Sequence, residues 1–156
     1  MAYVVEGLSP EPFAHLFQLG DAELAGMRAR RVRAAGNGYP CRVSLEDAGE
    51  GEELIVLHHV SHDVETPYRS AFAIYVREGA KQAPPRRDSL PPMLEKRRLS
   101  LRGYDESGVL LAALVSEPGD GDRGVRGLLS DSSAAEVHAH NAATGCFLAR
   151  IRRERA

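Results

Sequence analysis

The chain has 156 residues, of which 43% are hydrophobic and 27% charged, so it can fill a hydrophobic core and does not have the composition of a disordered protein. A net charge of −2 and few aromatic residues, with no tryptophan, argue against the basic field and base-stacking surface of a nucleic-acid-binding protein. No stretch approaches the roughly 18 apolar residues of a membrane span. The N-terminus, MAYVVEGLSPEPF, lacks the pattern of a secretory signal.

These properties predict a single domain over residues 1–156, in the size range of ordinary domains. We expect it in the cytoplasm, without nucleic acid or membrane as a partner. Thiols are normally reduced in that compartment, so the two cysteines are expected to be free, metal-bound or redox-active rather than a structural disulfide.

The first part of the chain alternates β-rich segments with helix-start signals. Ser9-Pro10 is typical of a helix start, and the apolar residues Phe13, Leu16 and Phe17 follow at helical spacing. GNGYP is a turn signal, and CRVSL after it alternates between apolar and polar residues. The expected elements are a strand at Tyr3–Val5, helices after Ser9 and after Gly20, an edge strand at Arg30–Ala35 and a strand at Cys41–Leu45.

The rest of the chain predicts mainly strands joined by short turns, which favours antiparallel pairing. A proline-rich loop spans Gly79–Pro92, and PGDGDRGVRGLLSD predicts a short helix with Val125, Leu128 and Leu129 facing the core. The expected strands are Glu53–Val60, Ser70–Glu78, Arg97–Tyr104, Gly108–Ser116, Glu136–Asn141 and Cys146–Arg152. The fold class is therefore α+β, a mainly antiparallel sheet of about six or seven strands with a few short helices.

The last two strands form a predicted hairpin around HAHNAATGC. If His140 lies opposite Cys146, one face of the hairpin carries the polar and thiol groups and the other is apolar. A four-residue loop that pairs Asn141 with Cys146 would mix the two sets, so it ranks second. With His140 opposite Cys146, the residues that share the polar face are Glu136, His138, His140, Cys146, Leu148 and Arg150.

Two imidazoles and a thiol in one patch allow three kinds of chemistry. Zinc binds Cys and His, which makes His138, His140, Cys146 and Cys41 candidate metal ligands. An imidazole beside a thiol can also activate it, with His140 as base and Cys146 as nucleophile. A disulfide between the two cysteines is a third alternative, and a solvated polar sheet face with a buried cysteine is a fourth.

Other residues suggest a site less directly. In HHVSH, His58 and His62 could join a metal site. We favour the interpretation that they are surface groups at the end of a strand, because no carboxylate or cysteine stands at ligand spacing from them. Arg42 and Arg69 stand beside strands and could clamp an anion. Surface ion pairs with the acidic EDAGEGEE turn are the simpler interpretation for both arginines.

Four stretches together, GYPCRVSLEDA, TPYRSAFAIYVRE, LRGYDESG and VHAHNAATGCFLARI, resemble a bacterial family catalogued as a domain of unknown function, number twelve hundred and three. The resemblance extends from about Tyr3 to Arg152. It implies a small, stand-alone, cytoplasmic bacterial protein, and it implies no activity, cofactor or partner. The positions that match the family's motifs are Cys41 with Arg42, Thr66–Arg69, and His140-Asn141 with Gly145-Cys146.

The leading hypothesis from the sequence is therefore a site for an unknown small molecule or for thiol chemistry. Cys146 and His140 would be catalytic, and the groups that bind the ligand would be Cys41, Arg42, Arg69 and Asn141. The rivals are a non-catalytic binding module or homodimer, and a zinc-stabilised fold. A functional Cys146 is expected to be partly exposed, in a concave pocket and near His140.

Overall fold

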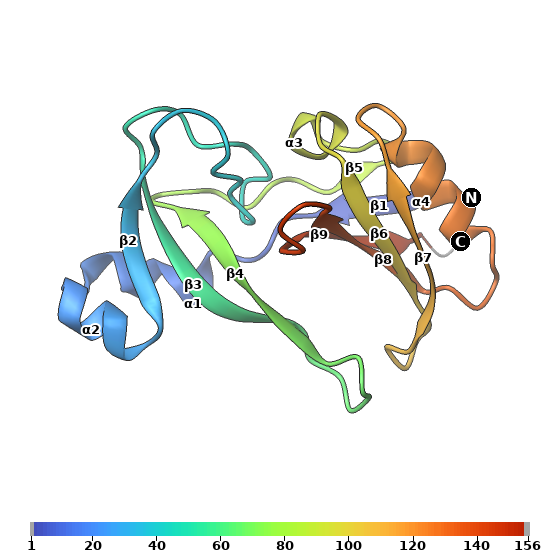
Figure 1. Ribbon diagram of the computed structural model, residues 1–156, viewed down its shortest axis with the longest axis horizontal. Coiled ribbons are helices and arrows are strands. Elements are labelled where there is room, and N and C mark those ends of the chain that lie inside the picture. Colours follow the sequence, from blue (N-terminus) through green and yellow to red (C-terminus); the bar gives the residue numbers. More distant parts are fainter. Residues whose placement is uncertain (1, 155–156) are drawn as a thin grey trace.

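The protein is built from two antiparallel sheets that lie side by side (Figure 1). The computed structural model describes residues 2–154, which form nine strands and four α-helices. The larger sheet has the strand order β5-β1-β9-β8-β6-β7, and the smaller has the order β2-β3-β4. The elements are β1 (Tyr3–Glu6), α1 (Glu11–Ala14), α2 (Asp21–Gly26), β2 (Ala29–Arg33), β3 (Glu53–His62), β4 (Ser70–Arg77), β5 (Arg86–Arg87), α3 (Pro92–Glu95), β6 (Leu99–Tyr104), β7 (Leu110–Ser116), α4 (Gly121–Leu129), β8 (Glu136–Asn141) and β9 (Phe147–Arg153).

This architecture confirms the α+β class and the mainly antiparallel pairing. The larger sheet, with six strands, is the expected sheet of about six or seven strands, and the three-stranded sheet is an addition that the sequence did not predict. The segment that was expected to be only a loop, Gly79–Pro92, leads from the small sheet to the large one. Within it β5 pairs with β1, and α3 begins at its end.

One face of the six-stranded sheet carries the larger hydrophobic core, and α4 covers it. Val125 and Leu129 of α4 pack with Leu101 of β6 and Val137 of β8, and all four side chains are buried. Gly124 allows this contact, since a Cβ there would lie 2.7 Å from Leu101 Cδ1. Gly124 therefore serves close packing between the helix and the sheet, although glycine is a poor helix former.

A second core lies under the three-stranded sheet. Helices α1 and α2, with the short 3-10 helix His15–Gln18 between them, place Phe13, Leu16 and Leu24 against Ile55 of β3 and Ile74 of β4. The helix-start prediction at Ser9 is thus confirmed to within one or two residues, because α1 begins at Glu11.

The segment Cys41–Leu45 joins the same core, but it is not a strand as the sequence suggested. Cys41 and Val43 are buried there, and the Leu45 amide donates to the Cys41 carbonyl across a tight turn. Leu45 has φ of 54°, in the left-handed region, which ends any extended run. Alternation of apolar residues over five positions was too short to distinguish a strand from such a turn.

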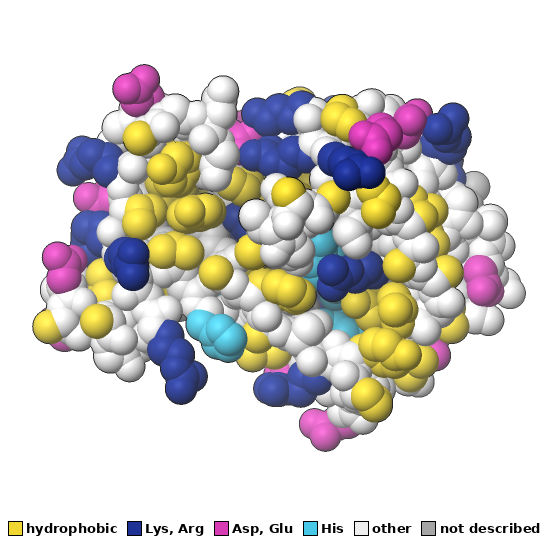
Figure 2. Space-filling view, in the orientation of Figure 1, with side chains coloured by type: hydrophobic (Ala, Val, Ile, Leu, Met, Phe, Trp, Pro, Cys, Tyr) yellow, Lys and Arg dark blue, Asp and Glu magenta, His cyan; other side chains and the backbone are white. Residues whose placement is uncertain are grey.

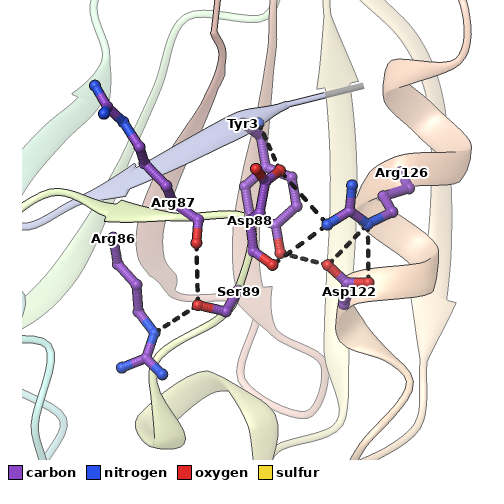
Figure 3. A network of polar contacts seen from close by, with 7 residues as sticks. All are labelled: Tyr3, Arg86, Arg87, Asp88, Ser89, Asp122 and Arg126. Atoms are coloured by element: carbon purple, nitrogen blue, oxygen red, sulfur yellow. Dashed lines mark hydrogen bonds and ion pairs between the residues drawn. The ribbon is translucent and has the colours of Figure 1, made fainter.

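A polar network fixes the first strand to the core helix (Figure 3). The Tyr3 hydroxyl donates to Asp122 Oδ1 at 2.6 Å, and Arg126 Nε donates to both carboxylate oxygens of Asp122, at 3.1 and 3.0 Å. Asp88, after β5, accepts from the Tyr3 amide and from Arg126. This Tyr3 network connects β1, β5 and α4 through contacts far apart in the sequence.

Among residues 2–154, no helix is long and apolar enough to cross a membrane.

Candidate functional site

The β8–β9 hairpin exists as predicted, but its register differs. The Asn141 amide donates to the Cys146 carbonyl, and the Gly145 amide donates to the Asn141 carbonyl, so the loop is the shorter one that ranked second. His140 therefore pairs with Phe147 and not with Cys146. The short loop is stabilised by Asn141 Oδ1, which accepts from the amides of Ala143 and Thr144.

A β-bulge prevents the mixing of polar and apolar faces that made this loop look unfavourable. The pairing shifts by one residue between Ala139 and His140, so Ala139 faces Ala149 while His140 faces Phe147. Leu148 enters the core, and Phe147 packs against His138 and His140 at ring distances of 5.5 and 5.8 Å. The expected faces are thus wrong at these two positions, because a bulge cannot be read from alternation.

The histidine face of the six-stranded sheet is buried, not solvated. His138 is 0% exposed and His140 is 1% exposed, because the ends of β3 and β4 cover them. Histidine atoms are visible deep between the parts of the surface formed by the two sheets, beside a basic side chain (Figure 2). Interpreting the hairpin as a solvated polar face is therefore wrong.

His62 reaches this face from the other sheet. β3 continues two residues beyond the predicted end at Val60, and an irregularity between Val60 and His62 redirects the chain. His58 is exposed, as expected of a surface group, whereas His62 is only 2% exposed. Treating His62 as a surface residue was wrong, because its burial depends on packing between two sheets.

His62, Glu136 and His138 form the candidate site, which we call the His–Glu–His cluster. One potential ligand atom from each residue lies within 4.8 Å of the other two. His138 Nε2 is 2.8 Å from Glu136 Oε1, and the rings of His62 and His138 are 4.9 Å apart, edge to face. Tyr104 lies against both rings, at 4.2 and 4.8 Å.

The β6–β7 turn holds His62 in place. The carbonyl oxygen of Gly108 lies 2.9 Å from His62 Nε2, so this nitrogen carries the proton and donates it. Gly108 has φ of 83°, and a Cβ there would lie 2.6 Å from Val64 Cγ1 and 3.1 Å from His62 Nε2. The Thr66 hydroxyl donates to the same carbonyl at 3.4 Å. Only glycine fits this turn, and the bond leaves the other nitrogen of His62 with a free lone pair.

Electrostatics set the charges of the cluster. Burial lowers the pKa of His138, although the bond to Glu136 acts in the opposite direction. Burial by itself would raise the pKa of Glu136, but the bond from His138 and the charge of Arg150 outweigh it and lower that pKa. Arg150 Nε lies 3.5 Å from Glu136 Oε2. These directions favour a neutral imidazole at His138 beside an ionised carboxylate at Glu136.

Unpartnered buried atoms concentrate on this side of the sheet. Among the described residues, five buried side-chain atoms have no hydrogen-bond partner, and three of them belong to His138, His140 and Ser61. His138 donates through Nε2 to Glu136, so its buried Nδ1 is an acceptor without a donor. Such groups are rare in folded proteins and commonly mark the place of a water molecule or an ion.

His140 lies on the same face but outside the cluster. Its Nδ1 donates to the Gly145 carbonyl at 2.9 Å, and its ring packs edge to face on Phe72 of β4. Burial, together with the charge of Arg102, lowers the pKa of His140 to about 3. No hydrogen bond joins His140 to Cys146 within residues 2–154, so the thiol–imidazole pair of the sequence hypothesis is not formed.

The two cysteines lie near Arg42 instead. Both are free, with Cys41 fully buried and Cys146 partly exposed. Arg42 is only 2% exposed and donates from Nε to the Phe147 carbonyl and from Nη1 to the Pro40 carbonyl. Burial lowers its pKa to about 10, and the nearby sulfur groups act in the opposite direction. Arg42 thus ties the 40–46 turn to β9, and the surface ion pair favoured from the sequence is wrong for this buried side chain.

Arg69 is the remaining residue of the predicted anion site. It forms an exposed ion pair at 2.9 Å, as the simpler interpretation has it, but the partner is Asp63 and not an acid of the EDAGEGEE turn. The structure therefore disperses the predicted set: Arg69 is on the surface, Arg42 with both cysteines is at the junction of the sheets, and His140 with Asn141 is in the hairpin.

Glu136 and His62 are the residues that sequence reasoning did not assign. Glu136 and His138 stand two apart on one strand and share a face, a signal that the alternation already contained. The histidine cluster HHVSH was a signal for His62, but nothing in the sequence linked it to Glu136, which is more than 70 positions away in the chain and belongs to the other sheet.

A cleft of about 410 Å³ opens beside the cluster. Its walls come from the end of β1, the end of β3 and strands β8 and β9, and they include His62, Glu136 and Arg150. Neither His138 nor Cys146 lines the cleft. The cleft connects one side of the His–Glu–His cluster to solvent.

Comparison with known proteins gives one match. Residues 38–153, about three quarters of the chain, match the family described as protein of unknown function (DUF1203). No curated protein and no solved structure shows a significant match. The matched range contains every residue of the His–Glu–His cluster and of the turn that holds it.

Proposed function

The chain belongs to the family of proteins of unknown function DUF1203, which supplies no activity, and on the geometry we propose that it binds a divalent transition metal ion, zinc first, through His62, Glu136 and His138. The observation that carries the proposal is the convergence of three side chains of types that zinc accepts, with their ligand atoms within 4.8 Å of one another, from strands of two different sheets. The zinc ligands expected from the sequence were His138, His140 and the cysteines; of these only His138 is retained.

The surroundings of the cluster support metal binding over a structural hydrogen-bond network. A metal-ligating histidine usually donates its second ring nitrogen to a carbonyl or carboxylate, as His62 does to Gly108. The unpartnered Nδ1 of His138 adds an acceptor that no protein donor satisfies. A hydrogen-bond network that served stability alone would be expected to satisfy that atom.

The number of ligands favours a reactive metal over a purely structural one. Structural zinc sites have four protein ligands, whereas catalytic sites have three and keep a position for water or substrate. The cluster offers three ligands and lies beside the 410 Å³ cleft. Bound there, the ion would act as a Lewis acid towards a molecule in the cleft.

We also propose that the protein works in the bacterial cytoplasm. The resemblance of its motifs to a bacterial family supports the source, and two unbonded cysteines agree with a reducing compartment.

The test is the zinc content of purified protein after incubation with zinc and desalting, measured by native mass spectrometry. We expect one zinc per chain in the wild type and none in His62→Leu or His138→Leu. His58→Leu is the matched control, because His58 is an exposed histidine of the same strand and should leave zinc binding unchanged. Glu136→Gln keeps the shape of the side chain and is expected to weaken binding without unfolding the protein.

The same experiment separates the cluster from the sites suggested by the sequence alone. His140→Leu and Cys146→Ser are expected to retain the zinc. Loss of zinc in these two variants, with retention in His62→Leu, would place the metal in the hairpin and overturn the proposal.

A further inference from the structure

The cleft beside the His–Glu–His cluster carries a second set of polar groups that metal binding does not use. Arg150 and Arg152 stand two apart on β9 and therefore point to the same side of the sheet as Glu136, which pairs with Arg152. Both arginines line the cleft. Their guanidinium groups therefore share the cleft with His62 and Glu136 of the proposed metal site.

The guanidinium of Arg150 is held by the protein, but not all of its N–H groups have a partner. Its Nη2 donates to the Ser61 carbonyl at 3.2 Å, and its Nε faces Glu136 Oε2 at 3.5 Å. Within the described part of the chain its Nη1 has no partner. Side-chain exposure is 33%, so the guanidinium is fixed by the protein while one edge remains available. A guanidinium held in this way loses little entropy when it binds an anion.

The side chain of Arg152 has fewer polar contacts than that of Arg150. Its only ion-pair partner among residues 2–154 is Glu6, with Nη1 and Oε2 3.7 Å apart, and its side chain is 52% exposed. This distance is too long for a hydrogen bond. Asp63, another acid of the cleft, is already paired with Arg69 at 2.9 Å. The acids of the cleft therefore leave Arg152 largely free.

Ser61 provides an independent sign of a missing ligand. The residue is 5% exposed and lines the cleft, yet its hydroxyl oxygen is buried without a hydrogen-bond partner. A hydroxyl in that state requires a partner that the chain does not supply. It stands beside the arginine that its own carbonyl anchors.

We propose that the cleft binds a small oxyanion, a carboxylate or phosphate group, between the guanidinium groups of Arg150 and Arg152 and the metal ion. Guanidinium groups bind the paired oxygens of both anions through charge-assisted hydrogen bonds. The volume of about 410 Å³ suits a metabolite-sized molecule and not a polymer. This inference rests on the proposed metal site, because the ion neutralises Glu136 and offers the third contact.

The experiment is calorimetric titration of the zinc-loaded protein with inorganic phosphate and, separately, with succinate. The two probes distinguish a phosphate ligand from a carboxylate ligand, and tighter binding of either one supports the proposal. Arg152→Gln is expected to weaken binding by about tenfold or more, the value of one charge-assisted hydrogen bond. Glu6→Gln is expected to strengthen it, because the amide no longer competes for Arg152. Arg98→Gln, an exposed arginine paired with Glu117, is the matched control.

Zinc content is measured on the same samples, so the two proposals fail separately. One zinc per chain with no binding of either probe, or with equal affinity in wild type and Arg152→Gln, overturns the anion site and leaves the metal site standing. Absence of zinc with anion binding that still depends on Arg152 overturns the metal site instead. Zinc bound together with arginine-dependent anion binding supports both.

Discussion

Two polar clusters lie on opposite sides of the six-stranded sheet, and they differ in how completely their groups are paired. In the Tyr3 network, Asp122 accepts from Tyr3 and Arg126, and Asp88 accepts from Arg126, so none of these side chains leaves a buried atom unpartnered (Figure 3). In the His–Glu–His cluster, His138 keeps an unpartnered Nδ1. A hydrogen-bond network that only stabilises the fold pairs all of its buried polar atoms, whereas a binding site leaves polar atoms for its ligand.

Added zinc should give the largest change in the free energy of unfolding, through the His–Glu–His cluster and not through the Tyr3 network. Zinc at one hundred times its dissociation constant is expected to raise the free energy of unfolding by about 2.7 kcal/mol, because it binds the folded state alone. His138→Leu is expected to abolish this gain. Urea denaturation with and without zinc measures both. A zinc effect of equal size in the variant would show that the ion binds elsewhere.

Removal of one hydroxyl tests the closed network. Tyr3→Phe deletes the 2.6 Å bond to Asp122 and is expected to lower the free energy of unfolding by about 1.5–3 kcal/mol, the range for hydrogen bonds to charged groups. The stabilisation by zinc should be unchanged in this variant. Tyr68→Phe is the control, since Tyr68 is 40% exposed. Equal effects of the two substitutions would contradict the structural role of the network.

The pH dependence of stability tests a third polar group, the carboxylate of Asp47. Asp47 is held by Arg97 and Lys96, with both shortest distances 2.5 Å. Burial would raise the pKa of Asp47, but the bonds from Arg97 and Lys96 lower it. A lowered carboxyl pKa in the folded state contributes stability above the unfolded value, near 3.9, and that contribution is lost as the pH falls through the folded value.

Asp47→Asn is therefore expected to be less stable than the wild type at pH 7, and the difference should shrink below about pH 4. Denaturation curves at several pH values measure this difference. A gap that stays constant down to pH 2 would mean that the carboxylate charge contributes nothing.

Breaking an exposed ion pair should give the smallest change in the free energy of unfolding. Arg98 and Glu117 are 2.8 Å apart, but their side chains are 62% and 59% exposed. Arg98→Ala is expected to change the free energy of unfolding by less than about 1 kcal/mol, because water and salt screen such pairs. A loss as large as that of Tyr3→Phe would remove the distinction between surface pairs and buried networks.

The sequence predicted most strands and the core helix α4 because their signals are local. The strands predicted at Ser70–Glu78 and Arg97–Tyr104 are present at Ser70–Arg77 and Leu99–Tyr104. The apolar residues Val125, Leu128 and Leu129 identified the buried side of α4. The same reasoning failed at Cys41–Leu45, where the alternation covers a turn that dips into a core.

For the candidate site, the sequence determined that β8 carries Glu136, His138 and His140 on one face, since a strand alternates with a period of two. Only the tertiary structure decided which of them matter together. The bulge at Leu148 set which residues of β9 share that face, and the packing of two sheets buried His62 beside His138. Local patterns fix the direction of a side chain, but contacts between distant strands depend on how sheets pack, and no periodicity encodes that.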